Sequence, residues 1–451
     1  MKYSSKLAIL TMFIASLPAL ADVRLPAIFA DHMVLQRNTP LNVWGTANAG
    51  EKVIVNLGKN SKTIIADQDG NWIVSMPSMS ANERQSHKLT IIGNNKIVLK
   101  NILIGDVWMG SGQSNMEWQL KGTLRGKEFT TAANHPNIRL FHIPKTRAKK
   151  PAKDVKTTWK ECTPENIPNF SAVLYHFGKK IHKEVGVPIG LINSSWGGSP
   201  IEPWTITKKS SGNMYNGMIA PITKFAVRGT IWYQGETNVI QKNGLAYNGK
   251  MKDLILGWRD AFNNHDMPFY FVQIAPWGNK RYADGQLPAL WEAQVATLKI
   301  PHTGMIVTTD LVDNINDIHP RNKHDVGDRL ARWALARDYR KKDVTYSGPL
   351  YKSMLIKGNE IQITFAHALA GLKSRDGKPL SEFTIAGTAG KFVPAKAVIS
   401  GSTVIVSAKN INSPKHVRFG WHRSANPNLI NTEGLPASPF QTNNWTGGTA
   451  E

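Results

Sequence analysis

Hydrophobic and polar positions follow one pattern at both ends of this chain and another in the middle. From residue 22 to about residue 100, short runs of alternating or β-branched residues are separated by turn residues. Two pairs of runs read as hairpins, one around Asp69-Gly70 and one around residues 93–95. Short strands at regular spacing are typical of a β-sandwich. The pattern therefore predicts an N-terminal β domain over residues 22–100.

After residue 100, strand-like and helix-like runs alternate. The strand-like runs are 138–143, 188–193, 225–234, 268–274 and 304–309, and the helix-like runs are 170–185, 247–263 and 287–300. This alternation predicts an α/β domain over residues 101–342, with a parallel sheet covered by helices. Short, turn-separated strands then return, which predicts a C-terminal β domain over residues 343–451.

The stretch 105–118, GDVWMGSGQSNMEW, places a serine just past a predicted buried strand. Functional side chains gather at the carboxyl ends of parallel strands. A helix beginning near Met116 would place Ser114 close to a helix N-terminus, where unpaired N–H groups stabilise negative charge. Ser114 is therefore a candidate nucleophile, and a simple helix-capping serine is the alternative.

Two further motifs follow predicted strands and could supply donors and a carboxylate. Residues 193–198, NSSWGG, contain consecutive glycines that would let backbone N–H groups approach a substrate oxygen, although a plain turn is the alternative. In residues 232–238, WYQGETN, Gln234 could donate to an oxyanion. Glu236 could orient a base or a sugar hydroxyl, or could simply begin a helix favourably.

Residues 316–320, NDIHP, place His319 on a loop before an amphipathic helix. A loop histidine is often a bystander, but Asp317 beside it and a serine upstream suit acyl transfer. The HExxH spacing of metallohydrolases does not occur, and Met116 replaces the second glycine of a GxSxG elbow. We therefore expect neither a metal nor an organic cofactor.

Composition and charge place the chain among ordinary globular proteins. A chain of 451 residues is long enough for two or three domains. Its residues are 41% hydrophobic and 19% charged, which is typical of globular proteins. The formal net charge is +23, but the basic residues are scattered rather than gathered in a stripe. This pattern predicts a solvated basic surface that helps to attract an acidic substrate, and no nucleic-acid partner.

The N-terminus resembles a secretory signal peptide over residues 1–21. Lys2 and Lys6 precede an apolar stretch at 7–17, and Ala19-Leu20-Ala21 offers a small-residue cleavage site. The apolar stretch is shorter than a membrane span requires, and no later stretch is long and uncharged enough to span one. We therefore expect no integral membrane segment once the signal peptide has been removed. Cys162 is the only cysteine, which leaves no lipid-attachment cysteine there and no internal disulfide. We expect an exported protein, periplasmic or secreted.

Four ordered motifs resemble those of sialate O-acetylesterases, a branch of the SGNH hydrolases. They are GSGQSNMEW around Ser114, NSSWGGSPIEPW from residue 193, WYQGETN from residue 232 and NDIHPRNKHDVGDRLARWAL from residue 316. The resemblance covers nearly the whole mature chain, including the closing LPASPF segment. It implies a flavodoxin-like α/β catalytic domain flanked by two β domains, and a serine esterase that removes acetyl groups from sugars.

The resemblance also implies roles for individual residues. Ser114 corresponds to the nucleophile and His319 to the base, while Gly197 or Gly198 and Gln234 correspond to oxyanion-hole donors beside the Ser114 N–H. Many SGNH hydrolases carry the orienting aspartate three residues before the histidine, where this chain has Asn316. Asp317 is therefore the predicted orienter and Glu236 its rival. Asn115, Trp196 and Glu236 are further candidates for substrate binding.

These observations predict an exported carbohydrate O-acetylesterase that acts on O-acetylated sialic acid. The same chemistry on acetylated xylan or another polysaccharide is the first alternative. A non-catalytic glycan-binding protein, built on the β domains, is the second. The expected partner is an acetylated sugar or glycan, and the oligomeric state stays open.

Overall fold

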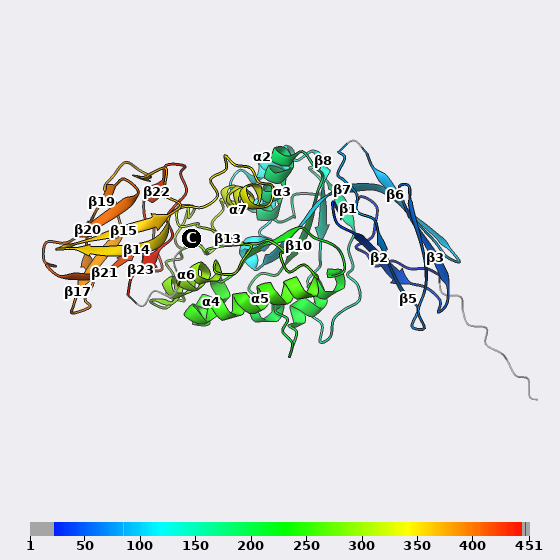
Figure 1. The fold of residues 1–451 in the computed structure, drawn as a ribbon, viewed down its shortest axis with the longest axis horizontal. Coiled ribbons are helices and arrows are strands. Elements are labelled where there is room, and N and C mark those ends of the chain that lie inside the picture. The colour runs from blue at the N-terminus through cyan, green and yellow to red at the C-terminus, as the bar shows by residue number, and fades with distance from the viewer. Residues whose placement is uncertain (1–21, 84, 444–446, 448–451) are drawn as a thin grey trace, which may run out of the picture.

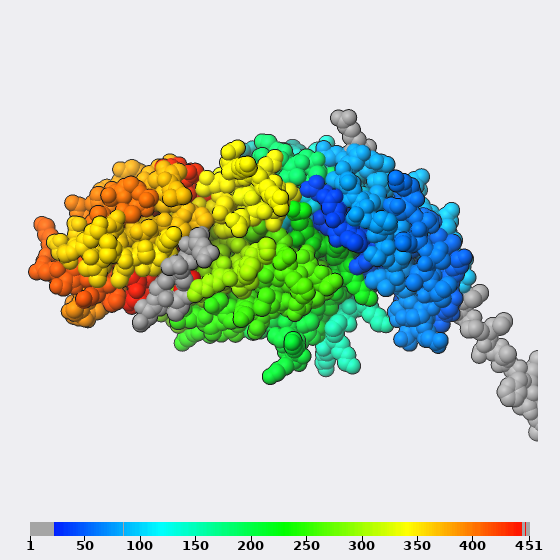
Figure 2. Space-filling view, in the orientation of Figure 1, coloured from blue at the N-terminus to red at the C-terminus, as the bar shows by residue number. Residues whose placement is uncertain are grey.

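The structure, a computed structural model, describes residues 22–83, 85–443 and 447. The predicted signal peptide, residues 1–21, lies outside the described residues. The N-terminal strands occupy one end of the long axis and the C-terminal strands the other, with the helices between them (Figure 1). The same order is visible on the surface (Figure 2).

A mainly parallel sheet forms the centre of the molecule. Its strands lie in the order β13 (Thr303–Ile306), β12 (Phe269–Val272), β11 (Gly229–Tyr233), β7 (Lys96–Gly112), β10 (Ile189–Ser195), β8 (His135–His142) and β9 (Trp159–Cys162). Every neighbouring pair is parallel except β8 and β9. The predicted α/β class is therefore confirmed, and β7 lies near the middle of the sheet.

Helices cover both faces of this sheet (Figure 1). On one face, α3 (Ala172–Val185) packs along α7 (Lys323–Arg337), and on the other α5 (Tyr247–Ala261) packs on α6 (Gln286–Thr297). Local sequence fixes the start of α3, because the Ser171 hydroxyl accepts from the Leu174 N–H. The helix ends where Gly186 adopts a left-handed φ of 67°. All three helices expected from the β/α alternation are thus present.

The described N-terminal residues, 22–83 and 85–100, contain six strands besides the first half of β7. They are β1 (Val34–Gln36), β2 (Leu41–Thr46), β3 (Lys52–Leu57), β4 (Asn60–Ile65), β5 (Asn71–Met76) and β6 (His87–Ile92). The hairpin predicted around residues 93–95 is confirmed, since Ile91 pairs with Ile97. The hairpin predicted around Asp69-Gly70 is wrong, because β4 pairs with β3 whereas β5 pairs with β2. The Asp67 carboxylate instead caps a loop between two sheets by accepting from the Asp69 and Asn71 N–H groups.

Strand β7 belongs to two parts of the molecule. Its first residues pair with β6 in the N-terminal region, and its last residues pair with β10 and β11. The predicted boundary between residues 100 and 101 therefore falls inside a strand. Buried side chains follow the same path, because one continuous core contains residues from Val23 to Leu350 together with Ala425. The strand that leads to Ser114 is therefore hydrogen-bonded to the N-terminal region at its start and to the central sheet at its end.

The C-terminal region is built from short, mostly antiparallel strands around a second core. They are β14 (Leu350–Lys357), β15 (Glu360–Ala366), β16 (Leu372–Ser374), β17 (Phe383–Gly387), β18 (Val393–Pro394), β19 (Lys396–Ser400), β20 (Thr403–Ser407), β21 (Pro414–Phe419), β22 (Leu429–Asn431) and β23 (Phe440–Gln441). The LPASPF segment is buried, and the Gln273 amide donates to the Ser438 hydroxyl at 2.9 Å. This segment ties the C-terminal region to the central sheet. Among the described residues, no helix is long and apolar enough to cross a membrane.

Candidate active site

A sharp exit from β7 presents Ser114 at the carboxyl edge of the sheet. Gly112 has a φ of 134°, and a Cβ there would lie 2.2 Å from the Tyr233 carbonyl oxygen, so only glycine fits between β7 and β11. The short helix α1 (Ser114–Glu117) follows at once. Ser114 is its first residue, and its N–H has no acceptor within the helix. The predicted strand-to-helix turn thus begins at the serine itself rather than at Met116.

Ser114 and His319 are in direct contact, although 205 positions separate them. The Ser114 Oγ lies 2.8 Å from the His319 Nε2, within the reach of a nucleophile and its base. The imidazole stacks on Trp118 with ring centroids 4.7 Å apart, which fixes the plane of the ring. Both side chains line a cavity of about 360 Å³. The other lining residues are Glu117, Trp118, Gln119, Lys121 and Gly122.

Asp317 lies on the far side of the imidazole. Its Oδ1 accepts the His319 backbone N–H at 2.9 Å and lies 3.6 Å from the His319 Nδ1. The second distance is too long for a good hydrogen bond, but catalytic hydrogen bonds often tighten only when substrate is bound. Asp317 is therefore positioned to orient the ring that contacts Ser114.

The surroundings of His319 favour a neutral imidazole. Burial lowers the pKa of His319, the positive charge of Lys323 lowers it further, and Asp317 acts in the opposite direction. A neutral imidazole can accept a proton from a hydroxyl, whereas an imidazolium cannot. The electrostatics of the site thus suit a general base near neutral pH.

Glu236, the rival orienter, contacts a different residue. It is buried at the start of α4 (Glu236–Ile240), where its Oε1 accepts from the Asn115 amide. The Asn115 Oδ1 in turn accepts from the buried Lys323 ammonium. Burial raises the pKa of Glu236 and lowers that of Lys323 to about 7. Asn115, Glu236 and Lys323 therefore form a buried polar cluster beneath the serine, away from the open cavity.

Gln234 lies deeper than its predicted oxyanion role requires. Its side-chain nitrogen faces three protein acceptors at 2.7–3.2 Å. They are the Gln113 Oε1, the Ser199 carbonyl and the Asn238 Oδ1. An amide has only two N–H hydrogens, so none is left for a substrate oxygen. The sequence-based expectation that Gln234 donates to the oxyanion is therefore corrected. In this structure its side chain links Gln113 to the Ser199 main chain.

The glycine motif follows β10, and its members lie in different settings. A Cβ added to Gly197 would lie 3.4 Å from the Ser114 Cβ, so this residue sits directly beside the serine. The Gly197 N–H donates to the Glu117 carboxylate. Gly198 has a φ of 76° and open space around it. Trp196 is half-buried beneath the Arg147 guanidinium, 4.8 Å from its ring centroid.

The sequence interpretation did not single out several residues of this site, and Glu117, Trp118 and Lys323 are the ones that contact its central residues. Glu117 and Trp118 stand in the same motif as Ser114, but nothing in their spacing assigns them a contact. Lys323 did carry a signal, because it precedes the apolar residues Val326 and Leu330 by one and two helical turns and so shares their face of the amphipathic helix expected after His319. A lysine on a buried stripe indicates a paired internal charge.

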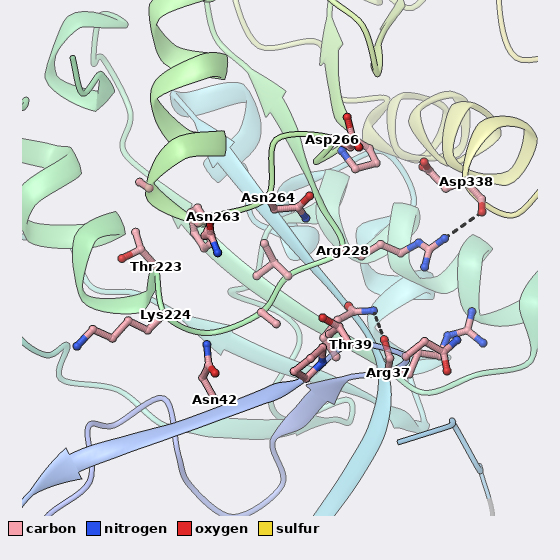
Figure 3. A pocket seen from close by; sticks show the side chains of 18 residues that line it. Arg37, Thr39, Asn42, Thr223, Lys224, Arg228, Asn263, Asn264, Asp266 and Asp338 are labelled. Atoms are coloured by element: carbon pink, nitrogen blue, oxygen red, sulfur yellow. Dashed lines mark hydrogen bonds between the residues drawn. The ribbon is translucent and has the colours of Figure 1, made fainter. Parts of the chain in front are cut away.

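A larger cavity, of about 790 Å³ (Figure 3), lies at the amino ends of β11 and β12, where Arg228 and Pro268 line it. It is lined by polar side chains that include Arg37, Asn42, Lys224 and Asn264. It contains neither Ser114 nor His319, so the size of a cavity does not identify the reactive one here.

Within the described ranges, no group of three or more His, Cys, Asp or Glu side chains is placed to hold a metal ion.

Comparisons with known proteins agree with this geometry. Residues 104–336 match the family model described as carbohydrate esterase, sialic acid-specific acetylesterase. The chain is 27% identical to the sialate O-acetylesterases of Homo sapiens and Rattus norvegicus, over 92% and 88% of its length and 92% and 89% of theirs. A crystal structure of a carbohydrate acetylesterase from Xanthomonas citri superposes with a TM-score of 0.89 at 36% identity, covering 94% of this chain and all of that one.

The family match spans β7, β10, β11 and α7, the elements that carry Ser114 and His319. The similarity to the Xanthomonas citri protein extends through both flanking β regions. The chain therefore belongs to the carbohydrate esterase family of sialic acid-specific acetylesterases.

Proposed function

We propose that this carbohydrate esterase removes acetyl groups from O-acetylated sialic acid by serine acyl transfer in an SGNH-type site. The contact between the Ser114 Oγ and the His319 Nε2, at 2.8 Å, is the observation that carries the proposal. Family membership supports esterase chemistry over the alternative of a non-catalytic glycan-binding protein.

In the first half of the reaction, the Ser114 Oγ attacks the acetyl carbonyl carbon while the His319 Nε2 takes the hydroxyl proton. The carbonyl oxygen becomes an oxyanion held by the Ser114 and Gly197 N–H groups. The C–O bond to the sugar then breaks, and the imidazolium donates its proton to the departing sugar oxygen. Acetyl-Ser114 remains, and Asp317 stabilises the imidazolium while it lasts.

In the second half, His319 takes a proton from water, and the resulting hydroxide attacks the acetyl group of Ser114. A second oxyanion forms in the same place and collapses, which breaks the bond between the acetyl carbon and the Ser114 Oγ and releases acetic acid. The acid then loses its proton to water and leaves as acetate. The proton on His319 returns to the Ser114 Oγ. Neither half requires a redox step, and water is the one reactant added to the acetylated sugar.

The parent sugar is proposed from the relatives and from charge. The mammalian relatives are named sialate O-acetylesterases. Lys121 lines the cavity, and Lys145 and Arg147 lie beside the Glu117 and Trp196 side chains. A positive group in the cavity, with two more on residues that contact Glu117 and Trp196, suits a sugar that carries a carboxylate.

An acetylated neutral polysaccharide such as xylan is the second candidate. The Xanthomonas citri relative, at 36% identity, is more similar to this chain than the mammalian enzymes are, and its description names only a carbohydrate. This observation supports a wider range of acetylated sugars.

A substrate panel separates these candidates. Purified protein would be offered O-acetylated sialic acid, acetylated xylo-oligosaccharide and 4-nitrophenyl acetate in parallel, with Ser114→Ala as the control. We expect acetate release to be fastest from the sialic acid and absent in the variant. Preference for the xylo-oligosaccharide would move the substrate to the second candidate. Undiminished release by Ser114→Ala would overturn the nucleophile.

Export is proposed separately, from the signal-like residues 1–21. In a bacterial host that exports through such signals, we expect the recovered protein to begin at Asp22. N-terminal sequencing of protein from the periplasm or medium measures this directly. A full-length chain confined to the cytoplasm would contradict it.

A further inference from the structure

The donor beside the nucleophile is already occupied by an acidic side chain. The Gly197 N–H donates to the Glu117 Oε2, and a Cβ on Gly197 would lie 3.4 Å from the Ser114 Cβ. Glu117 also lines the cavity that contains Ser114 and His319. A carboxylate oxygen thus accepts the N–H that the proposed mechanism assigns to the acetyl oxygen.

We propose that Glu117 is a displaceable plug of the oxyanion hole, which the acetyl group must move off the Gly197 N–H before Ser114 can react. The inference rests on the proposed function, because it assigns Gly197 as a donor for acyl transfer.

Two physical arguments exclude simultaneous occupation. The Gly197 N–H has one hydrogen, and a carboxylate that accepts it leaves nothing for a second oxygen. The oxyanion of the tetrahedral intermediate is also negative, and two negative oxygens at one donor repel each other strongly in a partly buried site. Glu117 must therefore move away before the intermediate forms.

The structure also provides a place for Glu117 to remain after it moves. The Glu117 Oε1 lies 2.6 Å from the Lys145 ammonium, and the Lys145 side chain is 43% exposed on the loop after β8. A rotation that breaks only the contact with Gly197 keeps this ion pair. The carboxylate then stays neutralised while the donor becomes free.

Gln234 supports this assignment from the other side. Its amide hydrogens are taken by buried acceptors, so the Ser114 and Gly197 N–H groups carry the stabilisation of the oxyanion. Blocking one of two donors has a large effect, because loss of a single oxyanion-hole donor typically costs about 10²–10³-fold in turnover. Occupancy of Gly197 by Glu117 thus controls the reactivity of Ser114.

The test compares Glu117→Ala and Glu117→Gln with wild type and with Glu184→Gln. Glu184 is a matched control because it forms an ion pair with Lys180 at 3.6 Å at the end of α3, outside the site. Two probes that carry no sugar are used. They are 4-nitrophenyl acetate and a small 4-nitrophenyl phosphonate, whose phosphoryl oxygen enters the oxyanion hole when Ser114 is labelled.

We expect Glu117→Ala to raise kcat/KM for 4-nitrophenyl acetate and the rate of phosphonate labelling by about tenfold. Glu117→Gln should fall between this variant and wild type, because its neutral amide oxygen still accepts from Gly197 but repels an oxyanion less. The Glu184→Gln control should match wild type. In a crystal structure of the wild-type phosphonate adduct, the phosphoryl oxygen should accept from Gly197, with Glu117 turned toward Lys145.

Other outcomes would overturn the proposal. Unchanged rates on both probes together with weaker turnover of acetylated sugar would make Glu117 a sugar contact. An adduct in which Glu117 still accepts from Gly197 would remove Gly197 from the oxyanion hole. Failure of the wild-type protein to react with either probe would instead count against acyl transfer itself. Unfolding temperatures of the variants separate these effects from loss of fold.

Discussion

The side chain of Asn115 donates to the main-chain carbonyl of Ile318 at 3.1 Å. The residue after the proposed nucleophile is thus bonded to the residue before the proposed base. Asn115 also contacts Glu236 and Lys323, two buried charges. One amide therefore sets the spacing between the β7 turn and the loop that carries His319.

Asn115→Ala is accordingly expected to damage both stability and turnover. Glu236 and Lys323 would each lose a partner, at a cost of about 1–3 kcal/mol for a buried polar group left unsatisfied. Loss of the contact to Ile318 would also let His319 drift, and a displacement of about 1 Å can cost ~10²-fold in rate. Thermal unfolding and kcat on 4-nitrophenyl acetate measure the two effects.

Asn166→Ala is the matched control for this change. Its amide donates to the Glu161 carbonyl at 3.1 Å, in a part-buried loop away from Ser114. It should lose a little stability and keep its kcat. If Asn115→Ala kept wild-type kcat, then the spacing of the two loops would be set by other contacts.

Ser114→Ala and His319→Ala are expected to separate chemistry from folding. Ser114→Ala removes one small hydroxyl at a turn, so the unfolding temperature should hardly change while acetate release stops. His319→Ala should lower kcat by roughly 10³-fold or more, as removal of a triad member does. Steady-state kinetics and thermal melts on both variants measure this. A change confined to KM would make His319 a binding residue.

The sequence predicted the arrangement of elements better than the contacts within the site. The β/α alternation located the parallel strands because their apolar runs and helical periods are local properties. The pairing of β5 with β2 depends on a loop capped by Asp67, which local turn signals around Asp69-Gly70 do not reveal. Long-range pairing is decided by packing, and no single window of sequence contains it.

The same limit applies to individual side chains. Ser114, Asp317 and His319 were found as motif members, and the structure brings them together. The contact between Gln234 and Gln113 and the contact between Glu117 and Gly197 each join residues 80 or more positions apart. A motif lists the residue types at a site, but the direction of each hydrogen bond follows from tertiary structure.

Asp317→Asn should be far more damaging to kcat than Glu236→Gln. Asp317 lies 3.6 Å from the His319 Nδ1, where its charge stabilises the imidazolium, so the amide should cost about 10²-fold or more in kcat with little change in KM. Glu236 instead contacts Asn115, so its amide should mainly lower the unfolding temperature. Kinetics and melts on both variants decide this. The reverse ranking of kcat would make Glu236 the orienter.

The pH dependence of kcat/KM should report the charges around His319. The free imidazole must be neutral to take the Ser114 proton, so activity falls as the pH drops through its pKa. Burial and Lys323 hold that pKa below the usual value of about 6.5. The acidic limb of the pH profile, where kcat/KM falls as the pH drops, therefore lies below this pH. Asp317 raises the pKa of His319, so Asp317→Asn should move the limb to still lower pH. Lys323 lowers it, so Lys323→Met should move the limb upward.

These opposite shifts distinguish electrostatics from a general loss of structure, which would lower activity at every pH without moving the limb. Lys180→Met is the control, because Lys180 pairs with Glu184 and Asp328 on the outer side of α3 and α7. It should leave the limb in place. Because Lys323 is itself buried with a pKa of about 7, its effect on His319 should weaken above neutral pH as the ammonium loses its proton. Shifts of the same sign in Asp317→Asn and Lys323→Met would show that the limb belongs to a group other than His319.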